Sequence, residues 1–310
     1  MEDILPLLNI KMPYNERISL INNIVNKGKS NYFELNLSVV STSLNYDKDN
    51  YIITPKGLKN SKRNAQDGIV LFGYERKNNM RANEDNINTD NNNIIFSRNN
   101  KYSETYNNDY GKDFLLNDFI FPIEYKEDNI SLYELPNFAI YYNTDDGNYY
   151  IKDFNTGVGA LMKIKRYIMK GNILINIGGN YLVIYIEKNK IIVKIFNNSI
   201  LEGSTNTNTN DNNNVNCDLK EFNIDENQNY FINIGRNQNC DIIIEDMMLS
   251  KIQCFIEYNA SDKCFYLNDG DGKKESTNGT WVFILNPTRI TNNFMFKAEH
   301  TLFVANLVNK

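Results

Sequence analysis

The sequence predicts an all-β protein made of two tandem β-sandwiches, with one short N-terminal helix and disordered Asn-rich loop insertions. Two observations favour this fold class. Short runs that alternate apolar and polar residues, such as residues 33–39 and 252–258, follow one another with Asn, Asp and Gly between them. Segments in the two halves of the chain also match each other at a nearly constant spacing, which indicates two copies of one fold.

The length and composition of the chain fit globular domains. A chain of 310 residues is sufficient for about two domains. A hydrophobic content of 41%, with 12% aromatic residues, supports packed cores rather than general disorder. The formal charge of −5 argues against a nucleic-acid binder, because such a protein needs a broad basic surface. Local basic groups can still bind a phosphate.

Neither a metal site nor a cofactor is expected. Cys217, Cys240, Cys254 and Cys264 show no CxxC spacing, and His300 is the single histidine. Three of the thiols lie in or beside apolar runs, which suits buried cysteines in a reducing compartment. The acidic N-terminus differs from a secretory signal, and no apolar run reaches the roughly 18–20 residues that span a bilayer. We therefore expect an intracellular protein, cytoplasmic or nuclear, without membrane insertion.

Residues 15–28 predict a helix within an N-terminal segment, residues 1–30. Ile18, Ile21, Ile24 and Val25 recur at helical spacing along this segment. The helix has two interpretations: it packs on the domain that follows, or it is a docking helix for a partner protein.

Residues 31–187 are predicted to form the first sandwich and residues 188–310 the second. Residues 77–112 and 204–216 are rich in Asn and read as a disordered insertion and a low-complexity loop. The expected strands are residues 33–39, 68–73, 118–121, 138–142, 149–151, 160–164, 173–177 and 181–186 in the first sandwich, and 191–196, 230–234, 241–245, 252–258, 264–267, 280–285 and 301–304 in the second.

The internal repeat supports this division. Residues 159–164 match 279–284, and residues 181–183 match 301–303, both at an offset of 120. Further upstream, residues 118–120 correspond to 241–243. The copies differ at their loops, and the first copy is expected to keep the scaffold without the polar residues described next.

Three polar phrases of the second copy lie on loops between strands. They are Gly235-Arg236, then Ser250-Lys251, then Ser276-Thr277-Asn278-Gly279-Thr280. Arginine offers a fork of donors, lysine a compact positive charge, and serine and threonine their hydroxyl groups. A phosphorylated side chain carries about −1.5 to −2 charges and three acceptor oxygens. At ~1.5–3 kcal/mol for each charge-assisted hydrogen bond, these groups could make binding depend on phosphorylation.

The order and spacing of these phrases resemble those of the forkhead-associated (FHA) domain. That family carries a Gly-Arg pair, a Ser-Lys/Arg-x-His phrase and a Ser-x-Asn-Gly-Thr phrase on loops at one end of an eleven-stranded sandwich. The resemblance covers residues 188–310 and, in degenerate form, residues 31–187. The resemblance implies a module that recognises phosphothreonine-containing proteins.

The resemblance also implies a role for each site residue. Arg236, Ser250, Lys251 and Thr277 would hold the phosphate, and Asn278 would hold the peptide backbone. Gly235, Gln253 and Gly279 would support the loops. Gln253 stands where the family has histidine, and we expect glutamine to replace its structural role.

The sequence also allows other interpretations of these residues and of the function. Taken singly, Arg236 reads as a solvated surface residue, and the Asn-Gly pair reads as a hairpin turn. An enzyme is not expected, since the chain lacks a Gly-rich phosphate loop and kinase phrases, and one histidine leaves little room for His-dependent catalysis. The main alternative is a phosphate-independent scaffold that binds partners through its sheet faces, its first sandwich or its N-terminal helix.

Overall fold

The computed structural model describes several stretches of the chain with gaps between them. The expected insertion at 77–112, the expected loop at 204–216 and His300 lie outside these stretches. Within the described part, no helix has the length and apolar character needed to cross a membrane. The described residues are 14–26, 32–41, 50–61, 63, 66–74, 117–121, 136–154, 159–197, 217–299 and 301–309.

The described residues form β-strands and one helix, so the prediction of an all-β protein is confirmed. Burial alternates along many strands, as in Cys254–Asn259, because successive side chains point to opposite faces of a sheet. The elements are α2 (Tyr14–Asn26), β1 (Phe33–Ser41), β2 (Asn50–Thr54), β3 (Gly57–Leu58), β4 (Ile69–Tyr74), β5 (Phe119–Phe121), β6 (Pro136–Asn143), β7 (Asn148–Asp153), β8 (Ala160–Ile164), β9 (Arg166–Met169), β10 (Ile173–Ile177), β11 (Asn180–Glu187), β12 (Lys190–Asn197), β13 (Asp218–Asn223), β14 (Tyr230–Gly235), β15 (Ile242–Ile243), β16 (Cys254–Asn259), β17 (Cys264–Asp269), β18 (Thr280–Phe283), β19 (Thr288–Arg289), β20 (Phe294–Ala298) and β21 (Thr301–Asn309).

The chain divides into two compact units that do not follow the sequence repeat. Unit 1 contains Met1–Ala160 together with Ile284–Lys310, and unit 2 contains Leu161–Phe283. The boundary expected between residues 187 and 188 falls within unit 2, where β11 and β12 form a hairpin. The division into 31–187 and 188–310 therefore describes the proposed copies of the sequence and stays a prediction.

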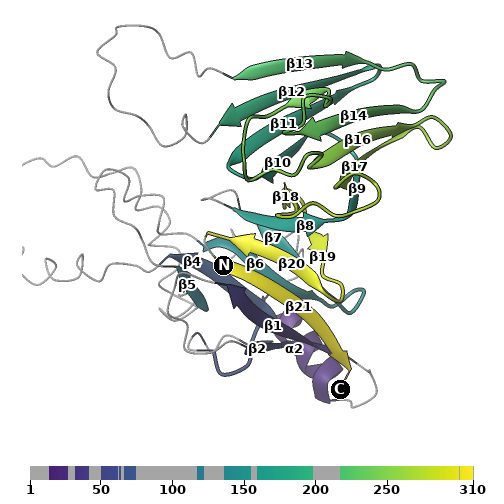
Figure 1. The fold of residues 1–310 in the computed structure, drawn as a ribbon. Helices are drawn as coiled ribbons and strands as arrows, with labels where there is room; N and C mark the ends of the chain where they lie inside the picture. The colour runs from purple at the N-terminus through teal and green to yellow at the C-terminus, as the bar shows by residue number, and fades with distance from the viewer. Residues whose placement is uncertain are drawn as a thin grey trace, which may run out of the picture. The chain divides into compact units, whose positions relative to one another are not determined.

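Unit 1 has two sheets, with strand orders β20-β21-β1-β2-β3 and β19-β7-β6-β4-β5 (Figure 1). Aromatic rings pack between them. Phe72 of β4 stacks on Phe138 of β6 at 4.3 Å between ring centroids, and it meets Phe303 of β21 edge-on at 5.9 Å. Such aromatic pairs add to the free energy of burial and join the two sheets.

The helix α2 packs on unit 1. Ile21 is fully buried, and Arg17 is 2% exposed. The guanidinium of Arg17 donates to the carbonyl oxygens of Asp67 (2.8 Å) and Tyr142 (2.6 Å). These contacts favour the packing interpretation of the helix. Docking of a second partner on it stays a prediction.

Unit 2 also has two sheets, with strand orders β13-β12-β11-β10-β18-β8 and β15-β14-β16-β17-β9 (Figure 1). Its core contains the inward residues of both sheets, including Leu182 and Val193 from one and Ile232 and Leu267 from the other, all fully buried. The cysteines are free thiols; Cys240 and Cys254 are buried, whereas Cys264 is half-buried because it lies at the start of β17.

Each unit takes strands from both proposed copies. The first strand, β1, pairs along its length with the last, β21, whereas β11 pairs with the strand that follows it, β12. In Figure 1 the yellow C-terminal strand accordingly lies beside the dark blue N-terminal one. In the same way β9 pairs with β17 and β19 pairs with β7. The proposed copies thus exchange their C-terminal strands.

This exchange predicts a specific cross-link. Asn36 of β1 lies opposite Asn306 of β21. Opposed residues of antiparallel strands have Cα atoms roughly 4.5–5.5 Å apart, within disulfide range. The double variant Asn36→Cys, Asn306→Cys is expected to form a disulfide under mild oxidation, detected by mass spectrometry of digested protein. The matched control joins Asn36→Cys with Ile186→Cys, because Ile186 lies at the same offset of 120 from Asn306 that relates residues 181–183 to 301–303. Cross-linking in the control alone would contradict the exchange.

Candidate functional site

The three polar phrases meet in unit 2. Arg236 directly follows β14, Ser250 lies on the loop between β15 and β16, and Thr277 lies on the loop between β17 and β18. The Ser250 hydroxyl accepts a hydrogen bond from the Thr277 backbone N–H at 3.0 Å and donates to the Thr277 hydroxyl at 3.4 Å. Residues that are 27 positions apart in the sequence therefore form one polar cluster.

Arg236 is tied to the same cluster. Its Nε donates to the Leu249 carbonyl oxygen at 2.8 Å, and its backbone N–H donates to the Ser250 carbonyl oxygen at 3.3 Å. The first bond fixes the plane of the guanidinium, while the side chain remains exposed. A fork of donors held in one plane suits the oxygens of a phosphate.

The remaining site residues lie at the same surface. Lys251 and Asn278 are exposed, and Ser250 is half-buried. The Asn278 amide donates to the Met248 carbonyl oxygen at 2.7 Å, which links the second and third phrases. The Asn278 carbonyl oxygen accepts a hydrogen bond from the indole of Trp281 at 3.0 Å. These two hydrogen bonds hold Asn278 in place, and Asn278 remains exposed to solvent.

Two glycines permit this close arrangement. A Cβ atom at Gly235 would lie 2.4 Å from the Lys251 carbonyl oxygen, which is backbone and cannot move aside easily. Gly279 has a φ of +76°, which side-chain-bearing residues rarely adopt. At Gly279 a Cβ atom would also lie 2.6 Å from the side chain of Lys163.

The side chain of Gln253 connects the loops that carry the second and third phrases. Its side chain is fully buried; Oε1 accepts from the Ser250 backbone N–H at 3.0 Å, and Nε2 donates to the Ser276 hydroxyl at 2.7 Å and the Gly279 carbonyl oxygen at 2.9 Å. One amide therefore connects the second phrase with the third. This geometry supports the structural role that was expected of glutamine at this position.

The structure adds residues that sequence reasoning missed. Buried Asp269 accepts from the Ser276 backbone N–H (3.0 Å), the Ser276 hydroxyl (2.6 Å) and the Thr280 hydroxyl (2.7 Å), which holds the ends of the third phrase. At an offset of 116 the internal repeat also aligns Asp153 with Asp269. Asp153 likewise accepts from a backbone N–H, that of Ala160. The chain contains many aspartates, so the alignment with Asp153 is the one signal in the sequence that could have identified Asp269 as a residue that supports the site.

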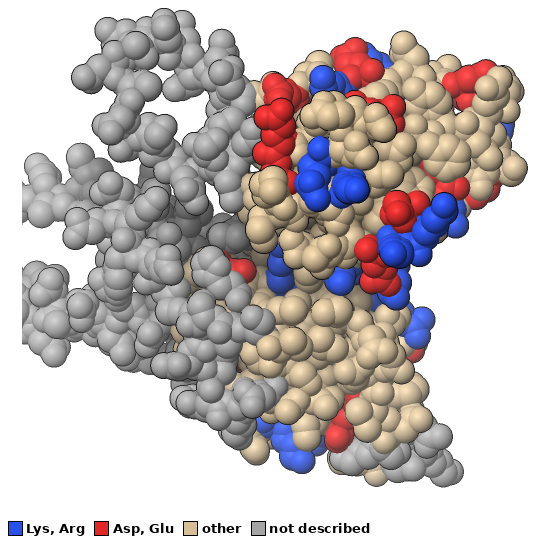
Figure 2. All heavy atoms as spheres, in the orientation of Figure 1, with Lys and Arg blue, Asp and Glu red and all other residues tan. Residues whose placement is uncertain are grey.

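The surface of the described residues carries charges of both signs. On the face drawn in Figure 2, Lys and Arg side chains are interspersed with Asp and Glu, without a broad field of one sign. Near the third phrase, Lys165 forms an ion pair with Glu275 at 2.6 Å, and this contact lowers the pKa of the Glu275 carboxyl. No group of His, Cys, Asp or Glu that could hold a metal ion occurs in the part of the chain that the structure describes.

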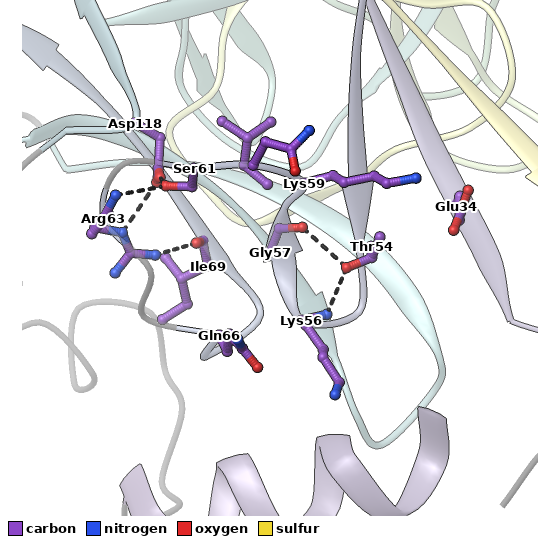
Figure 3. Close-up of a pocket in the computed structure, with 12 residues that line it drawn as sticks. Glu34, Thr54, Lys56, Gly57, Lys59, Ser61, Arg63, Gln66, Ile69 and Asp118 are labelled. Carbon is purple, nitrogen blue, oxygen red and sulfur yellow. Dashed lines mark hydrogen bonds and ion pairs between the residues drawn. The ribbon is translucent and has the colours of Figure 1, made fainter. Parts of the chain in front are cut away.

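A cavity of about 460 Å³ in unit 1 is a different kind of site (Figure 3). Two of its charged groups, Arg63 and Asp118, are paired with each other. Arg63 donates to Asp118 at 3.2 Å and, outside the lining, to Asp67 at 2.9 Å. Arg63 also donates to the Ile69 carbonyl oxygen, and Ser61 donates to Asp118. This network stabilises the loop before β4, so the polar cluster of unit 2 is the stronger candidate.

Comparison with known proteins identifies one family. Residues 232–299 match the family model of the FHA domain. The match contains all the candidate site residues; most of it lies in unit 2, and residues 284–299 belong to unit 1. No curated protein and no solved structure matches the chain. The resemblance stated for the C-terminal region is therefore confirmed, and the degenerate first copy stays a prediction.

Proposed function

We propose that the FHA domain carried by the C-terminal region of this chain binds phosphothreonine-containing proteins through Arg236, Ser250, Lys251, Thr277 and Asn278. FHA domains are in general phosphothreonine-binding interaction modules, and this family role supports binding rather than catalysis. The observation that carries the proposal is the contact of the Ser250 hydroxyl with Thr277, beside an arginine held by Leu249. An adaptor role in intracellular signalling follows from such a module.

The donors of the cluster explain how a phosphate would be selected. The Arg236 guanidinium and the Lys251 ammonium would supply charge, and the Ser250 and Thr277 hydroxyls would supply further donors. An unphosphorylated threonine offers one hydroxyl in place of three charged oxygens, so it would forfeit the charge-assisted bonds. Asn278 would hold the peptide backbone through its amide.

Arg236→Ala is expected to remove phosphate-dependent binding. Loss of two charge-assisted hydrogen bonds amounts to about 3 kcal/mol or more, which weakens binding about 100-fold. Isothermal titration calorimetry of the full chain with a phosphothreonine peptide and its unphosphorylated form measures this difference. Arg289→Ala, a change at an exposed arginine of β19, is the control and should bind as the wild type does. Equal binding of the two peptides by the wild-type chain would overturn the proposal.

The phosphate-independent scaffold keeps one specific observation in its favour. Phe231 of β14 is 52% exposed and Ile243 of β15 is 39% exposed, on adjacent strands of one sheet. Capture of partners from cell extract before and after phosphatase treatment separates the two functions. An unchanged set of partners, lost on Phe231→Ser and retained on Arg236→Ala, would favour the scaffold.

A further inference from the structure

The strand β8 lies next to the end of the third phrase. It pairs antiparallel with β18, and in this pairing Lys163 is directly opposite Trp281. Directly opposite residues of antiparallel strands point to the same face of the sheet, and their side chains lie within reach of each other. Lys163 and Trp281 therefore stand side by side where the third phrase enters β18.

The stem of Lys163 covers Gly279. The Cγ, Cδ and Cε atoms of Lys163 lie 3.4, 3.3 and 2.6 Å from the position that a Cβ atom of Gly279 would occupy. Gly279 is buried, although the neighbouring Asn278 is exposed. The methylene groups of a lysine can cover protein surface while the ammonium stays in water. The stem thus occupies the space that a side chain at position 279 would need.

Lys165, two residues further along the chain, contacts the start of the same loop. Its carbonyl oxygen accepts from the Asp269 backbone N–H at 2.9 Å, and its ammonium forms the ion pair with Glu275. This ion pair is exposed, and such pairs contribute little to stability. The stem of Lys163 on the buried Gly279 is therefore the side-chain contact of this segment that can hold the third phrase.

The orientation of Asn278 depends on its two neighbours. The Asn278 carbonyl oxygen accepts from the indole of Trp281 at 3.0 Å, and Gly279 follows Asn278 directly. Gly279 has a φ of +76°, and glycine can adopt many other backbone conformations. Without the stem of Lys163, Gly279 would be free to leave this conformation, and Asn278 would lose its fixed position.

We propose that Lys163 is a positioning residue of the phosphothreonine site, and that its methylene stem, rather than its charge, fixes Gly279 and thereby Asn278. This inference rests on the proposed function. It adds a residue from outside the region that matches the FHA family, residues 232–299. A site that is fixed before the peptide arrives loses less conformational entropy on binding, and this favours affinity.

The test compares side chains at position 163 in the full chain. Lys163→Met keeps a long stem without the charge, so it should bind a phosphothreonine peptide within about twofold of wild type. Lys163→Ala and Lys163→Thr remove the stem and should bind about tenfold more weakly. Threonine favours strands, so Lys163→Thr tests the same point if alanine disturbs β8. Calorimetry measures affinity and urea denaturation measures stability. Lys194→Ala, at a half-buried lysine of β12 in the same sheet, is the control and should bind as the wild type does.

The single tryptophan provides a second measurement that needs no peptide. Because the indole of Trp281 donates to Asn278, its fluorescence reports on the third phrase. Loss of the stem exposes the indole to water. The emission of Lys163→Ala without peptide should therefore shift to longer wavelength, whereas Lys163→Met should emit as the wild type does.

Three outcomes decide between the possible roles of Lys163. Wild-type affinity and emission in Lys163→Ala and Lys163→Thr would overturn the proposal. Equal weakening of binding in Lys163→Met and Lys163→Ala would also overturn it, and would assign the effect to the ammonium. Equal binding of phosphorylated and unphosphorylated peptides by the wild-type chain would overturn the proposed function, while the emission of the free variants would still show whether the stem holds the phrase.

Discussion

Gln253→Ala is expected to abolish phosphopeptide binding and to destabilise unit 2. The alanine side chain cannot replace the three hydrogen bonds that Gln253 makes to Ser250, Ser276 and Gly279. Leaving buried polar groups without partners costs about 1–3 kcal/mol for each group. The free energy of unfolding should therefore fall by about 3 kcal/mol or more, and the second and third phrases lose the amide that joins them.

Two further substitutions at position 253 test which hydrogen bonds of Gln253 are needed for binding. Glutamate at position 253 keeps an acceptor for the Ser250 N–H but offers no donor to Ser276 and Gly279, so Gln253→Glu should resemble Gln253→Ala. A neutral histidine offers one donor and one acceptor, so Gln253→His should restore part of the binding. Urea denaturation and calorimetry with a phosphothreonine peptide report the two effects. Gln228→Ala, on an exposed turn, is the control. Wild-type affinity in Gln253→Ala would contradict the role of this amide.

The local features of the fold could be read from the sequence because each has a short-range cause. The helix α2 follows from the spacing of Ile18, Ile21 and Ile24, and strands such as β16 follow from alternation of side chains. The polar phrases could be recognised together since their order resembles one family. The place of Gln253 was likewise expected from that resemblance.

The pairing of distant strands could not be predicted from the sequence. The segments at 181–183 and 301–303 match each other, so β11 and β21 offer similar apolar faces to β1. Alternation shows which side of a strand is buried, but it does not show which of two similar strands is its neighbour. The contacts of Asp246 could not be predicted for a related reason. Asp246 accepts hydrogen bonds from the Gly179 backbone N–H and the Asn180 amide, which lie 67 and 66 positions earlier in the chain.

Arg63→Met is expected to destabilise unit 1 strongly. Arg63 is 4% exposed and lies between Asp67 and Asp118, whose side chains are each 1% exposed. Figure 3 shows Arg63 beside Asp118. Removing the guanidinium leaves two buried carboxylates without their cation, and breaking a buried ion pair in this way costs about 3–5 kcal/mol. Both carboxylates also hold β4, because Asp67 accepts from the Ile69 N–H at 3.0 Å and Asp118 from the Leu71 N–H at 2.8 Å. Loss of the network should therefore open the start of β4.

The pH dependence of stability shows why Arg63→Met destabilises unit 1. Burial raises the pKa of Asp118 above its ordinary value even beside Arg63. A carboxyl with a raised pKa in the folded state stabilises the fold at low pH, and this stabilisation is lost as the pH rises through the folded-state pKa. Without Arg63 the pKa of Asp118 should rise further, so the deficit should be largest at neutral pH and smaller near pH 5 than at pH 7.

Hydrogen exchange of the β4 amides gives a local measurement, independent of the unfolding of unit 2. In Arg63→Met the Ile69 and Leu71 amides should exchange faster at pH 7, after correction for the intrinsic rates, and recover part of their protection near pH 5. Arg63→Lys keeps a cation but not the fork that reaches Asp67, Asp118 and Ile69 at once, so its protection should fall between wild type and Arg63→Met. A deficit that does not change between pH 7 and pH 5 would mean that lost packing of the arginine stem, rather than unpaired carboxylates, destabilises the loop.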